Sequence, residues 1–496
     1  MILASLWTVL VLAHHLEYVR GSDSSVQEDP NKGSEESSPL YLTPYINACD
    51  YETAKNKSKV PLFQIMANAS AYSGLITVNS TYQSNLFFLF LVAEGNKSDA
   101  PILLWTQGGP GLSSLFGQFL ENGPIAFDAR PNISVRSNTL QKNMSVIYLD
   151  VPVGTGFSFT QNNLGYSTSL EDITEHVMEF LRQFFELFSE FKDRDFYLAG
   201  ESYGARYSVA VAYQLLTDKR NLPLNLKGII GGNGFLGPVL DTADSSEFLY
   251  HTSMLDTEGR YRFEMTFQYM RNLTKIPENV TQVPFILLST IFADITRQNP
   301  SLFQNLTLYN DHASPLYTER PYHMLACFVF LNTSVELRRY IHVGDNAIFR
   351  YGYEPLIIAL APDWLRDITN LTQRVLNESR VLFYTGQLDA LFPAVNQRAY
   401  LSKLQWASAD EYQKAPRKPW RPPTWYNFMG YAGFMKQAPN FTDIVLLGMS
   451  HYGAADKPDE AYHLTTQFVA NKLQEVSSAP NADGADVASP PTSVPT

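Results

Sequence analysis

Residues 196–216 read FYLAGESYGARYSVAVAYQLL and place one serine, Ser202, between two glycines. The apolar run before Ser202 is typical of a buried strand, and the spacing after it is typical of a helix. A Gly-x-Ser-x-Gly pattern between a strand and a helix is typical of a sharp turn that exposes the serine hydroxyl at the edge of a sheet. Gly200 and Gly204 leave the room that such a turn needs. The stretch therefore predicts that Ser202 is a nucleophile.

A nucleophilic serine needs a base, and the base needs a carboxylate to orient it. In hydrolases built on an α/β sheet these partners follow the serine in the order Asp, then His. Only His451 and His463 lie far enough downstream, and His463 falls inside a helical pattern, where we interpret it as a packing or solvated residue. His451 closely follows the apolar run DIVLLG, and Asp389 follows RVLFYTG. We predict the triad Ser202, Asp389 and His451, against the alternative of a turn aspartate and a loop histidine.

Alternating strands and a long helix indicate the fold class. Further short apolar runs typical of strands are NLFFLFLV, PILLWT, SVIYLDV and KGIIGGN. Residues 169–191 have the apolar spacing of one long helix, and Thr168 with Glu171 predicts a capping box at its start. This alternation predicts an α/β-hydrolase fold, with a mainly parallel central sheet and helices on both faces.

The strand pattern fades between residues 241 and 339, where aromatic and polar residues mix. We expect a mostly helical cap insertion there. The hydrolase core is then formed by residues 39–240 and 340–475.

Composition excludes several classes of function. The net charge of −12 argues against nucleic-acid binding and against an anionic membrane surface as a partner. The two cysteines, Cys49 and Cys327, could pair as a disulfide, or Cys327 in MLACFVFL could be a buried thiol. No HExxH or CxxC pattern occurs, so we expect neither a metal site nor a cofactor.

The ends of the chain and its sequons predict a glycoprotein of the secretory pathway, either secreted or lysosomal. Residues 1–21 have the apolar run of a signal peptide, and no later run predicts a membrane span in the mature chain. Residues 22–38 and 476–496 have the composition of disordered segments. Thirteen Asn-x-Ser/Thr glycosylation candidates are present: Asn56, Asn68, Asn79, Asn96, Asn132, Asn143, Asn272, Asn279, Asn305, Asn332, Asn370, Asn377 and Asn440.

With Ser202, Asp389 and His451 in place, the chain resembles the serine carboxypeptidase family, and within it the vitellogenic carboxypeptidase-like branch. Six motifs in order carry this resemblance: WTQGGPGLSS, ENGP, YLDVPVGTGFSF, GESYGARY, IHVGD and YTGQLDALFPA. The resemblance implies an enzyme that removes single amino acids from peptide C-termini under mildly acidic conditions, so that its partners are peptide or protein C-termini.

The resemblance also implies roles for further residues. The backbone N–H groups of Gly109 and Tyr203 would form the oxyanion hole. The substrate's terminal carboxylate would be bound by the side chains of Gln107, Glu121 and Glu201 and by the Gly108 N–H. Two glutamates can bind an anion if they share protons, because a like charge raises the pKa of a carboxylic acid and a protonated acid can donate a hydrogen bond. Peptide binding should then weaken as the pH rises toward neutral.

Three motifs depart from the family pattern, at five residues. Gln107 stands where most members have Asn, and Gly204 with Ala205 reverses the usual Ala-Gly order. The histidine segment GMSHYGAADKP has Ser450 before His451 and Ala454 in place of Pro. Alternative functions are therefore a non-catalytic or weakly active relative that binds peptides or partners, and an acyltransferase on the same scaffold.

Overall fold

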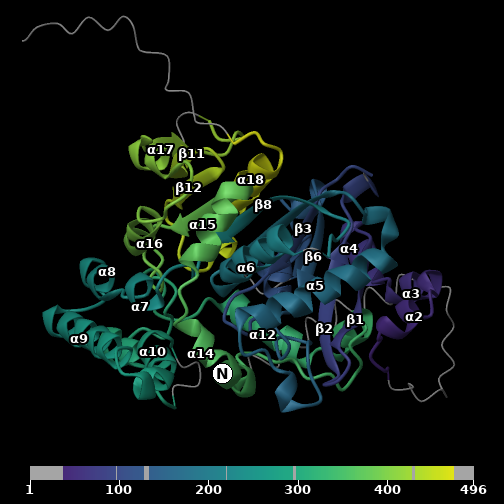
Figure 1. Ribbon diagram of the computed structural model, residues 1–496, viewed down its shortest axis with the longest axis horizontal. Helices are drawn as coiled ribbons and strands as arrows, with labels where there is room; N and C mark the ends of the chain where they lie inside the picture. The colour runs from purple at the N-terminus through teal and green to yellow at the C-terminus, as the bar shows by residue number, and fades with distance from the viewer. Residues whose placement is uncertain are drawn as a thin grey trace, which may run out of the picture.

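The computed structural model (Figure 1) describes residues 37–473 except for 97, 128–132, 219, 294–297 and 427–429. The expected signal peptide, nearly all of the acidic leader, the C-terminal tail and Asn132 lie outside the described residues. Within the described residues, no helix combines the length and the hydropathy that crossing a membrane requires.

A ten-stranded sheet forms the centre of the molecule, in the order β1-β2-β6-β3-β7-β8-β9-β12-β11-β10. The strands from β6 to β12 are parallel, whereas the pairs at both edges are antiparallel, so the predicted mainly parallel sheet is confirmed. Its strands are β1 Ala71–Asn79, β2 Ser84–Leu91, β3 Ile102–Thr106, β6 Ser145–Leu149, β7 Asp195–Glu201, β8 Asn225–Gly232, β9 Arg380–Gly386, β10 Lys418–Trp420, β11 Gly433–Ala438 and β12 Phe441–Leu446. A separate hairpin pairs β4 Ile125–Phe127 with β5 Ile133–Val135.

Helices cover both faces of the sheet, as predicted (Figure 1). Leu104 and Leu198 face one core, which they share with α5 Leu170–Leu187, α6 Tyr203–Thr217 and α15 Thr369–Glu378. The neighbouring residues Leu103 and Trp105 face the other core, with α4 Pro61–Ala67, α12 Tyr322–Thr333 and α18 Pro458–Val469. A strand covered on both faces needs apolar side chains in both directions, which explains the continuous apolar runs.

The remaining helices lie at the edges of the sheet and in the segment between β8 and β9. They are α2 Thr43–Asn47, α3 Tyr51–Ser58, α7 Val239–Thr242, α8 Ser246–His251, α9 Thr257–Leu273, α10 Val283–Ile291, α11 Leu302–Thr307, α13 Val335–Tyr340, α14 Glu354–Trp364, α16 Ala394–Leu401 and α17 Ala409–Lys414. Every named element of the described chain between β8 and β9 is helical, as expected for the cap insertion, and helices continue past residue 339 through α14 and α15.

The predicted start of the long helix is wrong by one residue. The N-cap of α5 is Ser169, whose hydroxyl accepts the N–H of Asp172. Thr168 instead binds the Asp172 carboxylate, at 2.8 Å from its N–H and 2.9 Å from its hydroxyl. Glu171 does not close a capping box, because its carboxylate pairs with Arg366. The helix itself is confirmed, although it ends at Leu187 and a separate turn, η5 Ser189–Phe191, follows.

The candidate disulfide is not formed, because the two cysteines lie in different environments. Cys327 is fully buried in α12, where it belongs to one of the two cores. Cys49 is exposed after the end of α2, and both residues are free thiols. The alternative interpretation of Cys327 as a buried thiol matches the structure.

Candidate active site

Ser202 lies at the junction of β7 and α6, as the opening motif predicts. Its backbone has φ 55° and ψ −121°, a conformation that side chains rarely adopt and that is typical of a strained nucleophile turn. A Cβ on Gly204 would stand 2.2 Å from the Thr106 carbonyl oxygen, and one on Gly200 would stand 2.5 Å from the Gly204 backbone. The two glycines are therefore required by close packing between this turn and β3.

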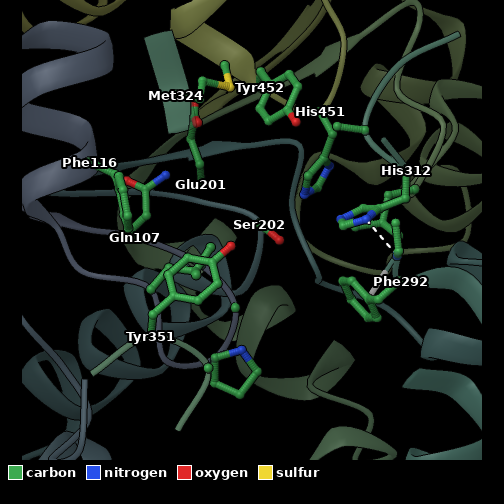
Figure 2. Close-up of a pocket in the computed structure, with 18 of the residues that line it drawn as sticks. Gln107, Phe116, Glu201, Ser202, Phe292, His312, Met324, Tyr351, His451 and Tyr452 are labelled. Carbon is green, nitrogen blue, oxygen red and sulfur yellow. Dashed lines mark hydrogen bonds between the residues drawn. The ribbon is translucent and has the colours of Figure 1, made fainter. Parts of the chain in front are cut away.

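Asp389 and His451 meet beside Ser202, although they lie 62 residues apart in sequence. The ends of β9 and β12 are adjacent, with Gly386 opposite Leu446, so the loops that follow both strands leave the same edge of the sheet. Asp389 Oδ2 is 2.9 Å from His451 Nδ1. Its other oxygen accepts the N–H groups of Leu391 and Phe392. Figure 2 shows the imidazole turned toward Ser202.

The His451 imidazole is buried, and Asp389 holds it in place. Burial lowers the pKa of His451, but the charge and hydrogen bond of Asp389, together with the charges of Glu201 and Asp311, outweigh burial, and the net shift is upward. Glu201 contributes a smaller upward effect through its charge. His463 lies elsewhere, on α18, 3.7 Å from Asp459.

The loop after β3 brings backbone N–H groups close to the nucleophile. A Cβ on Gly108 would stand 2.6 Å from the Ser202 Cβ, so only glycine fits there. Gly109 has φ 114°, a backbone conformation that residues other than glycine rarely adopt. Within the described chain, no backbone carbonyl accepts the N–H of Gly109 or Tyr203. Both groups are thus available to an oxyanion.

Glu121 and Glu201 form a buried pair, with exposed fractions of 5% and 3%. The two carboxyl groups are close enough for each to affect the protonation of the other, and Glu121 Oε2 has no hydrogen-bond partner among the described residues. Burial, and then the charge of Glu201, raises the pKa of Glu121 well above its usual value. Burial raises the pKa of Glu201 to about 7, although hydrogen bonds from Tyr384 and Ala454 partly oppose this.

Gln107 keeps the amide function that the family position carries. Its Nε2 donates to Glu121 Oε1 at 2.9 Å, and its Oε1 accepts the indole N–H of Trp105 at 3.0 Å. The Ala205 methyl is accommodated because glycines face it: a Cβ on Gly231 or Gly234 would stand 3.0 or 3.2 Å away. These two departures from the family pattern leave the local geometry intact.

The altered histidine loop is firmly held. The N–H of Ser450 donates to Asp456 Oδ2 at 2.9 Å, and its hydroxyl bonds to the same oxygen. The N–H of His451 donates to the carbonyl of Ala313 at 3.1 Å. The N–H of Ala454 donates to Glu201 Oε1 at 3.3 Å. The loop therefore contacts both the cap insertion and the glutamate pair.

A cavity of about 600 Å³ surrounds Ser202 and is lined by residues from the core and from the cap. Figure 2 shows Gln107, Glu201 and Phe116 on one side of Ser202, and His312 and Phe292 on the other side. No group of three or more His, Cys, Asp or Glu residues suited to a metal ion occurs in the described part of the chain.

Sequence reasoning missed four residues of this site: His312, Arg320, Tyr384 and Tyr452. His312 accepts the Ala293 N–H at Nδ1, at 2.9 Å, so its neutral ring carries the proton on Nε2. The sequence contains no usable signal for His312, Arg320 or Tyr452. His312 and Arg320 lie in the cap insertion, where the sequence shows no spacing typical of a site. Tyr452 lies in a loop, and a loop position does not specify which residues a side chain contacts. Tyr384 lies on the predicted strand RVLFYTG, two residues before its end, and that position was the only clue to its place beside Glu201.

Comparisons with known proteins identify the family and the fold. The serine carboxypeptidase family model matches residues 61–471. The chain is 35% identical to the venom serine carboxypeptidase of Apis mellifera over 438 residues, which cover 88% of this chain and 91% of that one. It is 31% identical to the vitellogenic carboxypeptidase of Aedes aegypti over 466 residues, which cover 94% and 95% of the two chains.

A solved structure shares the fold. A prohormone-processing carboxypeptidase of Saccharomyces cerevisiae matches with a TM-score of 0.66 and 18% identity, over 83% of this chain and 93% of that chain. This match confirms the predicted α/β-hydrolase architecture, and the sequence matches confirm the predicted family. The chain belongs to the serine carboxypeptidase family.

Proposed function

We propose that this enzyme releases single amino acids from peptide C-termini through an acyl-enzyme on Ser202. The observation that carries the proposal is the buried Glu121–Glu201 pair, which lies in the same cavity as Ser202 and His451. A protease that cuts inside a chain has no use for two protonated acids at this place, whereas an exopeptidase must recognise a terminal carboxylate.

The triad performs the two halves of the reaction. Ser202 Oγ attacks the scissile carbonyl carbon while its proton passes to His451 Nε2, and Asp389 holds the imidazole through Nδ1. The N–H groups of Gly109 and Tyr203 stabilise the oxyanion. His451 then gives the proton to the leaving amine. A water molecule attacks the acyl-enzyme by the same route, which releases the shortened peptide and restores Ser202.

The glutamate pair holds the leaving residue. When protonated, Glu121 and Glu201 can donate hydrogen bonds to the substrate carboxylate, with the Gln107 amide and the Gly108 N–H beside them. Because the pKa of Glu201 is about 7, the pair keeps its protons at mildly acidic pH and loses one toward neutral pH. An ionised pair repels the substrate carboxylate, so binding weakens as the pH rises.

We also infer that the protein passes through the secretory pathway and acts outside the cell or in an acidic compartment. Two of the sequon asparagines, Asn79 and Asn279, are half-buried. Nine others are exposed: Asn56, Asn68, Asn143, Asn272, Asn305, Asn332, Asn370, Asn377 and Asn440. The accessibility of these sites supports glycosylation, and the acid requirement of the glutamate pair supports an acidic working environment.

Fluorophosphonate labelling at about pH 5.5 tests the catalytic assignment, because that reagent reacts with activated serines. We expect the wild type to be labelled and Ser202→Ala to be unlabelled, with labelling of His451→Ala strongly reduced. Release of the last residue from an N-blocked dipeptide should fall about 10⁴-fold in both variants.

A second substrate tests the role of the glutamates. The C-terminal amide of the same dipeptide lacks the terminal carboxylate, so its kcat/KM should be far lower at acidic pH. Labelling that persists in Ser202→Ala, or equal hydrolysis of the free acid and the amide, would contradict the proposed function.

A further inference from the structure

Arg320 is the only arginine or lysine among the described residues that line the cavity around Ser202. The rest of the lining is mainly aliphatic and aromatic, and includes Phe116, Met324 and Phe328. A guanidinium in such surroundings is costly unless its donors are satisfied. Its presence therefore needs a reason that packing does not supply.

The hydrogen bonds of Arg320 are incomplete. Its Nη1 lies 3.2 Å from the hydroxyl of Tyr351. Its Nε is buried and has no hydrogen-bond partner in the described structure. Tyr351 is itself held between aromatic rings, 6.0 Å from Phe116 and 5.0 Å from Phe328 between ring centroids. The guanidinium is thus fixed in place while one of its donors is unused.

The charge of Asp311 acts on Arg320, but only one Asp311 oxygen is engaged in hydrogen bonds, and the other has no partner among the described residues. One oxygen of Asp311 accepts the hydroxyl of Tyr452 at 2.9 Å and the N–H of Ala313 at 3.0 Å. No ion pair joins Asp311 to Arg320. Burial also raises the pKa of Asp311, so its negative charge is weakest under acidic conditions. The positive charge of Arg320 is therefore only partly compensated.

The position of Arg320 relative to the glutamate pair indicates which part of a bound peptide would contact Arg320. Tyr351 contacts Phe116, and Glu121 follows on the next turn, in η2 Gly117–Asn122. Figure 2 shows Tyr351 and Phe116 on the side of Ser202 where Glu201 lies. A residue whose terminal carboxylate reaches the glutamates would therefore direct its side chain toward Tyr351 and Arg320.

We propose that Arg320, with Tyr351 and Tyr452, forms a subsite that selects an acidic side chain, glutamate or aspartate, on the C-terminal residue of the substrate. This inference rests on the proposed role of Glu121 and Glu201 in holding the peptide terminus. A substrate carboxylate in the cavity would pair with the Arg320 guanidinium, which forms no ion pair among the described residues, and charge-assisted bonds between arginine and carboxylate are among the strongest in proteins.

The test compares N-blocked dipeptides that differ only in the last residue: glutamate, its neutral isostere glutamine, or leucine. At about pH 5.5 the glutamate side chain is ionised, since its ordinary pKa is about 4.3. We expect wild-type kcat/KM to be at least about tenfold higher for glutamate than for glutamine, and Arg320→Gln to reduce that ratio to about one. The glutamine and leucine substrates should change by less than about threefold in the variant.

Arg374→Gln is the matched control, because Arg374 lies on α15 and, among the described residues, pairs with Glu378 alone, on the surface. Fluorophosphonate labelling of Ser202 checks that Arg320→Gln keeps its active site. An equal rate for glutamate and glutamine in the wild type would overturn the proposal. So would an Arg320→Gln variant that loses activity equally on all three dipeptides, since Arg320 would then bind the terminal carboxylate itself. If the wild type cleaves none of the three, the proposed carboxypeptidase function fails instead.

Discussion

At the scale of single residues, the histidine loop carries the change that most affects chemistry. Ala454 stands where the family pattern has Pro, and its N–H donates to Glu201. Proline has no N–H and could not make this bond. Gly453 is equally constrained, since it has φ 54° and a Cβ there would stand 2.0 Å from a Glu201 oxygen. The substitution therefore gives Glu201 an additional donor, which stabilises its ionised form.

Ala454→Pro should move the alkaline limit of peptidase activity upward. Without the N–H, the ionised form of Glu201 loses a hydrogen bond, so its pKa rises above the present value of about 7. Peptide binding, which by our proposal needs the protonated pair, should then persist to higher pH, by roughly half a unit to one unit. The measurement is kcat/KM against pH for a blocked dipeptide.

Ala454→Gly is the control for this change, because it keeps the N–H. An alkaline limit in Ala454→Pro that coincides with that of Ala454→Gly would show that the bond has no effect on Glu201. Serine labelling distinguishes a shifted pH profile from a damaged site.

At the scale of elements, a buried ion pair joins α14 to α6. Arg206 on α6 is fully buried, and its Nη2 contacts the Asp363 carboxylate at 3.2 Å and the Asp363 carbonyl at 2.9 Å. Asp363 on α14 also accepts the hydroxyl of Tyr203 and the N–H of Leu170 at the start of α5. Three helices are thus connected directly behind the nucleophile turn.

Asp363→Asn should destabilise the fold while keeping its shape. Arg206 would become a buried charge without an anion, which costs about 3 kcal/mol or more in the free energy of unfolding. Denaturation by urea, followed by tryptophan fluorescence, measures the change. Glu378→Gln, which breaks the exposed pair with Arg374, should change the same quantity by less than about 1 kcal/mol. Equal effects of the two substitutions would contradict the argument.

At the scale of the whole molecule, the fold places His451, which must lose its proton, next to Glu121 and Glu201, which must keep theirs. Glu121 follows β3, Glu201 ends β7 and His451 follows β12, so the three groups come from distant parts of the chain. The proposed mechanism needs a neutral His451 and a protonated glutamate pair. Ionised Glu201 raises the pKa of His451, so protonation of the pair also lowers the pKa of the base. The acidic form of the pair thus favours both binding and catalysis.

Glu201→Gln should widen the pH range of activity on both sides. A glutamine cannot ionise, so the loss of peptide binding around pH 7 is removed. It also removes a charge that raises the pKa of His451, so the acidic limb moves to lower pH. The pH profile of kcat/KM for a blocked dipeptide measures both limbs. Unchanged limbs would show that Glu201 does not titrate in the working range.

The sequence by itself determined the fold class and the order of the triad. Continuous apolar runs predicted buried parallel strands, because a strand covered on both faces needs apolar side chains in both directions. The glycines around Ser202 predicted a tight turn, since close packing excludes any Cβ there. The sequence signal for the start of a helix was less reliable, because neighbouring residues can both serve as the N-cap. The N-cap of α5 is Ser169 and not Thr168, and the Glu171 carboxylate pairs with Arg366, which is distant in sequence.

The tertiary structure alone decided which polar groups share a site. Tyr384, Ala454 and Glu121 reach Glu201 from three separate segments, and their combined contacts set how readily it ionises. Arg320, His312 and Asp311 come from the cap, whose sequence has no periodic signal for a site. The folded chain likewise decided that Cys49 and Cys327 do not pair, because Cys327 is buried in the core and Cys49 is exposed. Hydrogen bonds and charges act over a few ångströms, and only the folded chain determines which residues come that close.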